Sequence, residues 1–171
     1  STVVVSNFII LPLDKNIRPL PIGQGELLLE GDEIAIIAIG YPVHHALEAA
    51  RILEGESGIR VSVVNARFVK PLDKALICRV AERSKYVITV EEHALQGGFG
   101  SAVLECLADE DIRPQAIRRI GIPDIFVDQG PQDLLRQKYG ITAGRIVAEA
   151  KDLITNNERK VRRRATTASM R

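Results

Sequence analysis

The chain has 171 residues, 46% of them hydrophobic and 26% charged, and its formal net charge is +1. This length fits a single domain with one substantial core. The nearly balanced charge gives no overall positive field, so neither nucleic acid nor a membrane surface is expected as a partner. Two cysteines are too few for the disulfide framework of a small secreted protein, which favours a reducing compartment.

Both ends of the chain differ in composition from its middle. Prolines at positions 12, 19 and 21 remove backbone donors, which predicts an extended linker over residues 1–21. Residues 157–171 carry six basic residues and one acidic residue among few apolar ones, which predicts a basic disordered tail. The arginine run in this tail leaves a kinase, a membrane or nucleic acid open as partners, although a solvated tail is favoured. Residues 22–156 are expected to form the folded domain.

Between these ends, strand patterns alternate with helix patterns. A short strand at 26–30 is expected to turn at Gly31 and Asp32 and to form an antiparallel hairpin with residues 34–39. That second run is apolar at every position, as in a strand covered on both faces. There follow a helix at 44–53, a strand at 59–64, a helix at 73–84 capped by Asp73, a strand at 86–90, a helix at 100–108, a strand at 115–120 and helices at 132–139 and 142–156. This order predicts a three-layer α/β sandwich with a mostly parallel sheet and an antiparallel edge strand.

Polar residues follow the predicted parallel strands at their carboxyl ends, where ligands bind in such sheets and helix N-termini also point. Arg67 could bind an anion there, although pairing with a neighbouring carboxylate is favoured. Asp128 could be functional, although a helix cap is favoured. No nucleophile elbow and no lysine-containing phosphate loop is present, so a self-sufficient active site is not expected.

The segment after the strand at 86–90 has two interpretations. A carboxylate and an imidazole could act as acid and base, and the glycines that follow could bring backbone donors to a phosphate at a helix start. Alternatively, a glutamate caps the helix amides, His93 packs at a contact and the glycines only permit a tight loop, which is slightly favoured. A metal is not expected, because no second histidine or cysteine cluster converges here. The candidates for a domain contact or a weak anion site are Arg67, Asp73, Glu91, Glu92, His93, Gly97, Gly98, Gly100, Ser101 and Asp128.

Four motifs, taken in order, resemble the final domain of the 1-deoxy-D-xylulose-5-phosphate synthase family. They are Pro-Ile-Gly-Gln-Gly at 21–25, Arg-Phe-Val-Lys-Pro-Leu-Asp at 67–73, Val-Glu-Glu-His at 90–93 with Gly-Gly-Phe-Gly-Ser at 97–101, and Gly-Ile-Pro-Asp at 121–124. The resemblance covers roughly residues 12–154. The middle two motifs also occur, more loosely, in transketolase and in the beta subunit of 2-oxo-acid dehydrogenase E1 components, whereas the first and last favour the synthase.

The resemblance implies an enzyme that condenses pyruvate with glyceraldehyde 3-phosphate, with thiamine diphosphate and magnesium held in the two preceding domains. The third domain, which resembles the transketolase C-terminal domain, would support assembly and a homodimer, so no catalytic, cofactor-binding or metal residue is expected here. Residues 3–7 read Val-Val-Val-Ser-Asn where the family has Tyr-Pro-Arg-Gly-Asn, so the family's substrate-binding arginine has no match. The implied compartment is the bacterial cytoplasm, or else a plastid. Two alternatives remain: an end domain of a transketolase or E1 beta subunit, and a freestanding module that binds a phosphorylated ligand at the glycine-rich loop.

Overall fold

A computed structural model describes residues 19–124 and 131–168 of the chain. Asp128 and most of the expected linker, residues 1–18, lie outside the described residues. In chain order the elements are β1 (Glu26–Leu29), β2 (Ile34–Ala38), α1 (Pro42–Ser57), β3 (Val61–Asn65), α2 (Lys74–Arg83), β4 (Tyr86–Ala94), α3 (Phe99–Asp109), β5 (Ala116–Ile122), α4 (Gln132–Lys138) and α5 (Ala143–Ala168). The alternation of strands and helices predicted from the sequence is therefore confirmed.

The five strands form one sheet in the order β1-β3-β2-β4-β5. Strands β2, β3, β4 and β5 are parallel, and β1 pairs antiparallel with β3 at one edge. Ile34 on the central strand β2 is in register with Val61 on β3 and with Tyr86 on β4. The predicted mostly parallel sheet with an antiparallel edge strand is confirmed.

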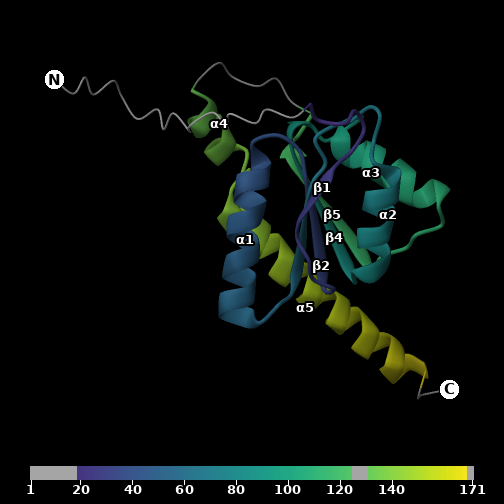
Figure 1. Cartoon of the computed structure of the whole chain (residues 1–171). Coiled ribbons are helices and arrows are strands. Elements are labelled where there is room, and N and C mark those ends of the chain that lie inside the picture. Colours follow the sequence, from purple (N-terminus) through teal and green to yellow (C-terminus); the bar gives the residue numbers. More distant parts are fainter. Residues whose placement is uncertain (1–18, 125–130, 169–171) are drawn as a thin grey trace.

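Helices cover both faces of the sheet. Alternate residues of β2 point to opposite sides, so its apolar side chains pack against a helical layer on each face. Ile34, Ile36 and Ala38 pack with α1 and α5, whereas Ala35 and Ile37 pack with α2 and α3. All five of these side chains are 0% exposed. Figure 1 shows the resulting three layers, with α1 and α5 on one side and α2 and α3 on the other.

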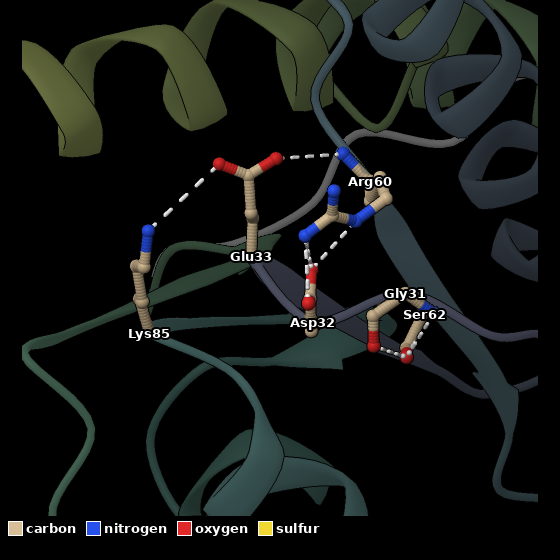
Figure 2. Close-up of polar contacts among 6 residues, drawn as sticks. All are labelled: Gly31, Asp32, Glu33, Arg60, Ser62 and Lys85. Carbon is tan, nitrogen blue, oxygen red and sulfur yellow. Dashed lines mark hydrogen bonds and ion pairs between the residues drawn. The ribbon is translucent and has the colours of Figure 1, made fainter.

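The predicted hairpin between the first two strands is wrong, because β3 lies between β1 and β2. The connection crosses the start of β3 so closely that a methyl group added to Gly31 would lie 2.5 Å from the Val61 nitrogen. The Ser62 hydroxyl accepts a hydrogen bond from the Gly31 N–H (2.9 Å) and donates one to the Gly31 carbonyl (2.7 Å). Figure 2 shows this crossing.

Ion pairs also stabilise this crossing, which lies at the amino ends of the parallel strands (Figure 2). The Arg60 guanidinium donates to both carboxylate oxygens of Asp32, with its Nη2 at 2.6 and 2.7 Å. The Arg60 backbone N–H donates to Glu33 Oε2 at 3.0 Å, and Lys85 Nζ lies 3.9 Å from the other oxygen of Glu33. Gly31 is needed because its backbone passes very close to the start of β3 at this crossing, and not because the chain forms a two-residue turn.

The expectation of a disordered tail from residue 157 is also wrong for the described residues, because α5 continues to Ala168. Its sequence holds no glycine or proline after Gly144, and arginine and lysine have high helix propensity. Asn157 also ties this part of the helix to the domain, since its Nδ2 donates to Gln115 Oε1 (2.7 Å) and to the Tyr86 hydroxyl (3.3 Å). The last turns of α5 project past the sheet (Figure 1). The domain boundaries at 21 and 156 stay predictions.

Candidate functional site

The candidate site lies at the carboxyl edge of the parallel strands, where β4 runs further than its neighbour β2. Strand β2 ends at Ala38, opposite Val90, but β4 continues to Ala94. Between Val90 and Ala94 the register with β5 shifts, so Glu91, Glu92 and His93 lie in an irregular, bulged stretch. Such bulges re-aim side chains at the end of a strand.

Glu91 is the buried charged residue at the centre of this edge, with 0% of its surface exposed. Its Oε2 accepts a hydrogen bond from the Phe99 N–H (2.7 Å) and its Oε1 accepts one from the Gly100 N–H (2.8 Å). These are the first amides of α3, whose N-cap residue Gly98 has no side chain to offer. A carboxylate on β4 therefore caps α3, where its charge also interacts favourably with the positive end of the helix dipole.

The glycines around Glu91 make room for its carboxylate. A methyl group on Gly98 would overlap Glu91 Oε2 and the Ala94 carbonyl. On Gly100 it would lie 2.6 Å from Thr89 Oγ1 and 3.1 Å from Glu91 Oε1, and on Gly121 2.9 Å from Glu91 Cγ. Gly97 differs, because nothing lies within 4 Å of such a methyl group, but its φ of +69° favours glycine. The glycine pattern thus accommodates an internal side chain.

Ser101 and Arg119 hold the loop between β4 and α3. The Ser101 hydroxyl accepts from the Gly97 N–H (3.1 Å) and donates to the Leu95 carbonyl (3.0 Å). Arg119 Nη1 donates to the same carbonyl (2.8 Å) and to the Ser101 hydroxyl (3.0 Å). Arg119 therefore joins β5 to this loop.

The other motif residues form a second group on the β1–β3 side of the same edge. Asp73 caps α2, as predicted, by accepting from the Leu76 N–H (3.0 Å), and its second oxygen accepts from the Gly25 N–H (2.9 Å). Arg67 Nη2 lies 2.5 Å from Glu26 Oε2, so its guanidinium pairs with a neighbouring carboxylate. The sheet order separates this group from the Glu91 group, because β2 lies between β3 and β4.

Comparison with known proteins connects these features to one family. The model of the family described as "Transketolase, C-terminal domain" matches residues 23–146. The chain belongs to the transketolase C-terminal domain family.

Relatives of this transketolase C-terminal domain are synthases. It is 59% identical over 138 residues to 1-deoxy-D-xylulose-5-phosphate synthase 1 of Geobacter sulfurreducens, which covers 81% of this chain and 22% of the relative. It is 52% identical over 141 residues to the synthase of Heliobacterium modesticaldum, covering 82% of this chain and 22% of the relative. The chain thus spans about a fifth of the length of the curated relatives it matches.

Solved structures share its fold. A split gene transketolase, described as an inactive beta4 tetramer, has a TM-score of 0.73 and 39% identity, covering 83% of this chain and 45% of that one. Transketolase from Leishmania mexicana has a TM-score of 0.55 and 21% identity, covering 78% of this chain and 18% of that one, and so shows the fold alone.

At the N-terminus of α3, the residues of this transketolase C-terminal domain do not fit a diphosphate site. A diphosphate would need free backbone donors at a helix N-terminus, but Glu91 accepts the hydrogen bonds of the first α3 amides. No group of three or more histidine, cysteine, aspartate or glutamate side chains comes together among residues 19–124 and 131–168. His93 is exposed and Glu92 half-buried. Over the same ranges, no helix is both long and apolar enough to cross a membrane.

Sequence reasoning missed Arg119, and it placed Gly121 in the motif at 121–124 without a role beside Glu91, although both residues complete the Glu91 group of this transketolase C-terminal domain. A signal for Arg119 is present, because Arg118 and Arg119 interrupt an apolar strand and strand periodicity sends them to opposite faces. Arg118 pairs with Glu149 and Asp152 on α5, and Arg119 reaches the loop before α3. The motif at 121–124 marks Gly121, but no sequence pattern shows its role, because that role depends on the approach of Glu91 from a neighbouring strand.

Proposed function

We propose that this domain is the third domain of a 1-deoxy-D-xylulose-5-phosphate synthase, in which it supports the catalytic domains and contributes to a homodimer. The enzyme condenses pyruvate with glyceraldehyde 3-phosphate and releases carbon dioxide. The identity of 59% to the Geobacter sulfurreducens synthase supports this assignment over a transketolase or an E1 beta subunit. The parent is expected in the bacterial cytoplasm, because the relatives named above are bacterial.

One observation carries the supporting role: Glu91, the first residue of the Glu-Glu-His motif, is directed inward to the glycine-rich start of α3. The Glu91 carboxylate is fully buried and accepts two backbone hydrogen bonds. A general acid or base must instead reach a substrate proton, and a phosphate cradle must keep its donors free. Thiamine diphosphate and magnesium are therefore proposed to bind to the preceding domains of the same chain.

Exposed apolar side chains at the carboxyl edge support a contact with those domains. Leu20 and Ile22 are 57% and 79% exposed just before β1, which begins at this edge, and Tyr41 is 46% exposed just after β2. His93 is exposed at the same edge. Aromatic and aliphatic side chains left in water beside polar groups are typical of a surface that packs against another domain.

A domain exchange tests the assignment. Replacing the matching region of the Geobacter sulfurreducens synthase with residues 19–168 of this chain should retain formation of deoxyxylulose phosphate from pyruvate and glyceraldehyde 3-phosphate. A matched chimaera with the C-terminal domain of the Leishmania mexicana transketolase should lose it, because it shares the fold at only 21% identity to this chain. A folded but inactive first chimaera would contradict the proposal.

The isolated chain supplies the complementary test. With thiamine diphosphate, magnesium and both substrates it should form no product, and turnover would show that catalytic groups lie on this domain. Calorimetry with inorganic phosphate, nucleotides and sugar phosphates addresses the freestanding binding module. We expect no heat of binding, because Glu91 occupies the α3 amides; saturable binding that is lost in Ser101→Ala would favour the module.

A further inference from the structure

Two thiols meet between the helices α2 and α3, away from the candidate site. Cys78 lies in α2 and Cys106 in the second half of α3, and their Sγ atoms are 3.8 Å apart. Both cysteines are free. A disulfide has an S–S length of about 2.05 Å, so the two sulfur atoms must approach each other by about 1.8 Å for a bond to form.

The two thiols differ in access to solvent. Cys106 is 3% exposed, whereas Cys78 is only partly buried. A reagent in solution therefore reaches Cys78 first, and Cys106 then lies behind it as the second thiol. An accessible thiol next to a second thiol is the arrangement in which the first cysteine reacts with an oxidant and the second resolves the product to a disulfide.

We propose that Cys78 and Cys106 are an oxidation site that closes to an intradomain disulfide when the chain meets a small-molecule disulfide. Nothing in the proposed synthase role requires this pair, so the two proposals stand separately. The bond would tie α2, which Asp73 caps, to α3, which Glu91 caps. It would thus link the helices that support the two halves of the carboxyl edge.

The reaction balances as two thiol–disulfide exchanges. The Cys78 thiolate attacks one sulfur of the small disulfide, forms a mixed disulfide and expels one thiolate. The Cys106 thiolate then attacks Cys78 Sγ, forms the Cys78–Cys106 bond and expels the second thiolate. Each protein thiol has lost one proton and one electron, and the small disulfide has been reduced to two thiols.

The surroundings of Cys78 make the first step slow at neutral pH. Burial, the contact with Cys106 and the negative charges of Glu110 and Glu82 raise the pKa of the Cys78 thiol to about 11. Because the thiolate is the nucleophile, roughly one thiol in ten thousand is reactive at pH 7. The rate of oxidation is expected to rise about tenfold per pH unit between pH 7 and pH 9.

Oxidised glutathione is the probe. The folded full-length chain is incubated with it at pH 7 and pH 9, and intact mass and peptide maps are recorded over time. We expect the wild-type chain to lose two hydrogens, to yield a Cys78–Cys106 cross-linked peptide faster at pH 9, and to melt at a higher temperature until dithiothreitol is added. Unmodified thiols at pH 9, a persistent glutathione adduct, or a disulfide between two chains would overturn the proposal.

Matched serine variants test the order of the two steps. Cys106→Ser should accumulate one glutathione on Cys78, because the resolving thiol is gone, and Cys78→Ser should stay unmodified, because Cys106 is buried. Circular dichroism checks that both variants are folded, and urea-unfolded chains should react at every remaining thiol. Equal adduct formation in the two folded variants would overturn entry through Cys78.

Discussion

The side chain of Glu91 connects the end of β4 to the start of α3. Glutamine has nearly the same size as glutamate but no charge, so Glu91→Gln changes the chemistry of this contact and not its size. In Glu91→Gln, an amide nitrogen replaces one acceptor and faces a backbone N–H donor of Phe99 or Gly100. Hydrogen bonds to a charged acceptor contribute about 1.5–3 kcal/mol each, so we expect a loss of about 2–4 kcal/mol in the free energy of unfolding. Urea denaturation measures it, with the exposed Glu48→Gln as control; equal stability of the two variants would contradict the capping role.

Gly97 and Gly98 are adjacent but glycine is needed for different reasons. In Gly98→Ala the new methyl group overlaps the Ala94 carbonyl and the Glu91 carboxylate, so we expect a loss of about 3–5 kcal/mol. In Gly97→Ala there is open space but a φ of +69°, which costs about 1 kcal/mol. Thermal and chemical denaturation of both variants check the difference. If the two were equally destabilised, crowding around Glu91 would not be the reason for the motif.

Residue patterns predicted the capping by Asp73 correctly but favoured capping by Glu91 or Glu92 only slightly over a catalytic or ligand-binding role. The Asp73 cap is local, since it joins residues three positions apart. Glu91 contacts amides eight and nine residues away, and its contact depends on how far β4 extends past β2. A sequence shows that a carboxylate and a glycine-rich helix start are close along the chain, but not that they meet.

At the level of elements, β1 was predicted as a strand but was paired with the wrong neighbour. Gly31 and Asp32 resemble a hairpin turn, and such turn residues carry no information about a strand that inserts later in the sequence. The insertion of β3 depends on contacts made across the sheet, such as those of Ser62 and Arg60.

Ser62 tests this crossing. Ser62→Ala removes both hydrogen bonds to Gly31 from a position that is 3% exposed. Leaving half-buried backbone groups without partners costs about 1–3 kcal/mol, whereas Ser57→Ala at the exposed end of α1 should change stability by less than about 0.5 kcal/mol. Denaturant titration gives the difference, and amide exchange at Gly31 should accelerate only in the first variant. Unchanged exchange at Gly31 would contradict this role for Ser62.

The Asp32–Arg60 pair predicts how pH affects the same crossing. Hydrogen bonding and charge from Arg60 lower the pKa of Asp32 below its ordinary value of 3.8. Because the folded pKa is the lower one, the stabilisation is present above about pH 4 and is lost as the pH falls through the folded pKa. Wild type should therefore be more stable than Asp32→Asn at pH 6, with a difference that shrinks below pH 4. A difference that is constant with pH would show that the pair does not contribute.

At the scale of the whole molecule, the layers were predictable because they follow from periodicity, whereas the extent of the last helix was not. The fully apolar run at β2 specifies burial on both faces, and the stripes of α1 and α5 specify their inner sides. Beyond residue 156 composition predicted disorder, because net charge is high and apolar residues are few. Composition alone does not show that a helix, once formed, extends through arginine and lysine at little cost in free energy.

Truncation separates the part of α5 that stabilises the domain from the part that only continues the helix. Removing residues 158–171 keeps Leu153, which is 5% exposed in the core, and the hydrogen bonds of Asn157. Residues 158–160 are exposed, so we expect a change of less than about 0.5 kcal/mol and a melting temperature within about 2–3 °C of the full chain.

A shorter variant is the matched control for this truncation. Ending the chain at Asp152 removes Leu153 and Asn157 together, and the loss of a buried leucine alone costs about 2–5 kcal/mol. Calorimetry should therefore show a much lower melting temperature for the chain ending at 152 than for the chain ending at 157, while circular dichroism shows helix lost in both. If the two truncated chains melted at the same temperature, Leu153 and Asn157 would not be stabilising the domain. If instead the chain ending at 157 melted well below the full chain, the basic turns after Asn157 would be stabilising it, and the helix beyond the core would have to be counted as part of the domain.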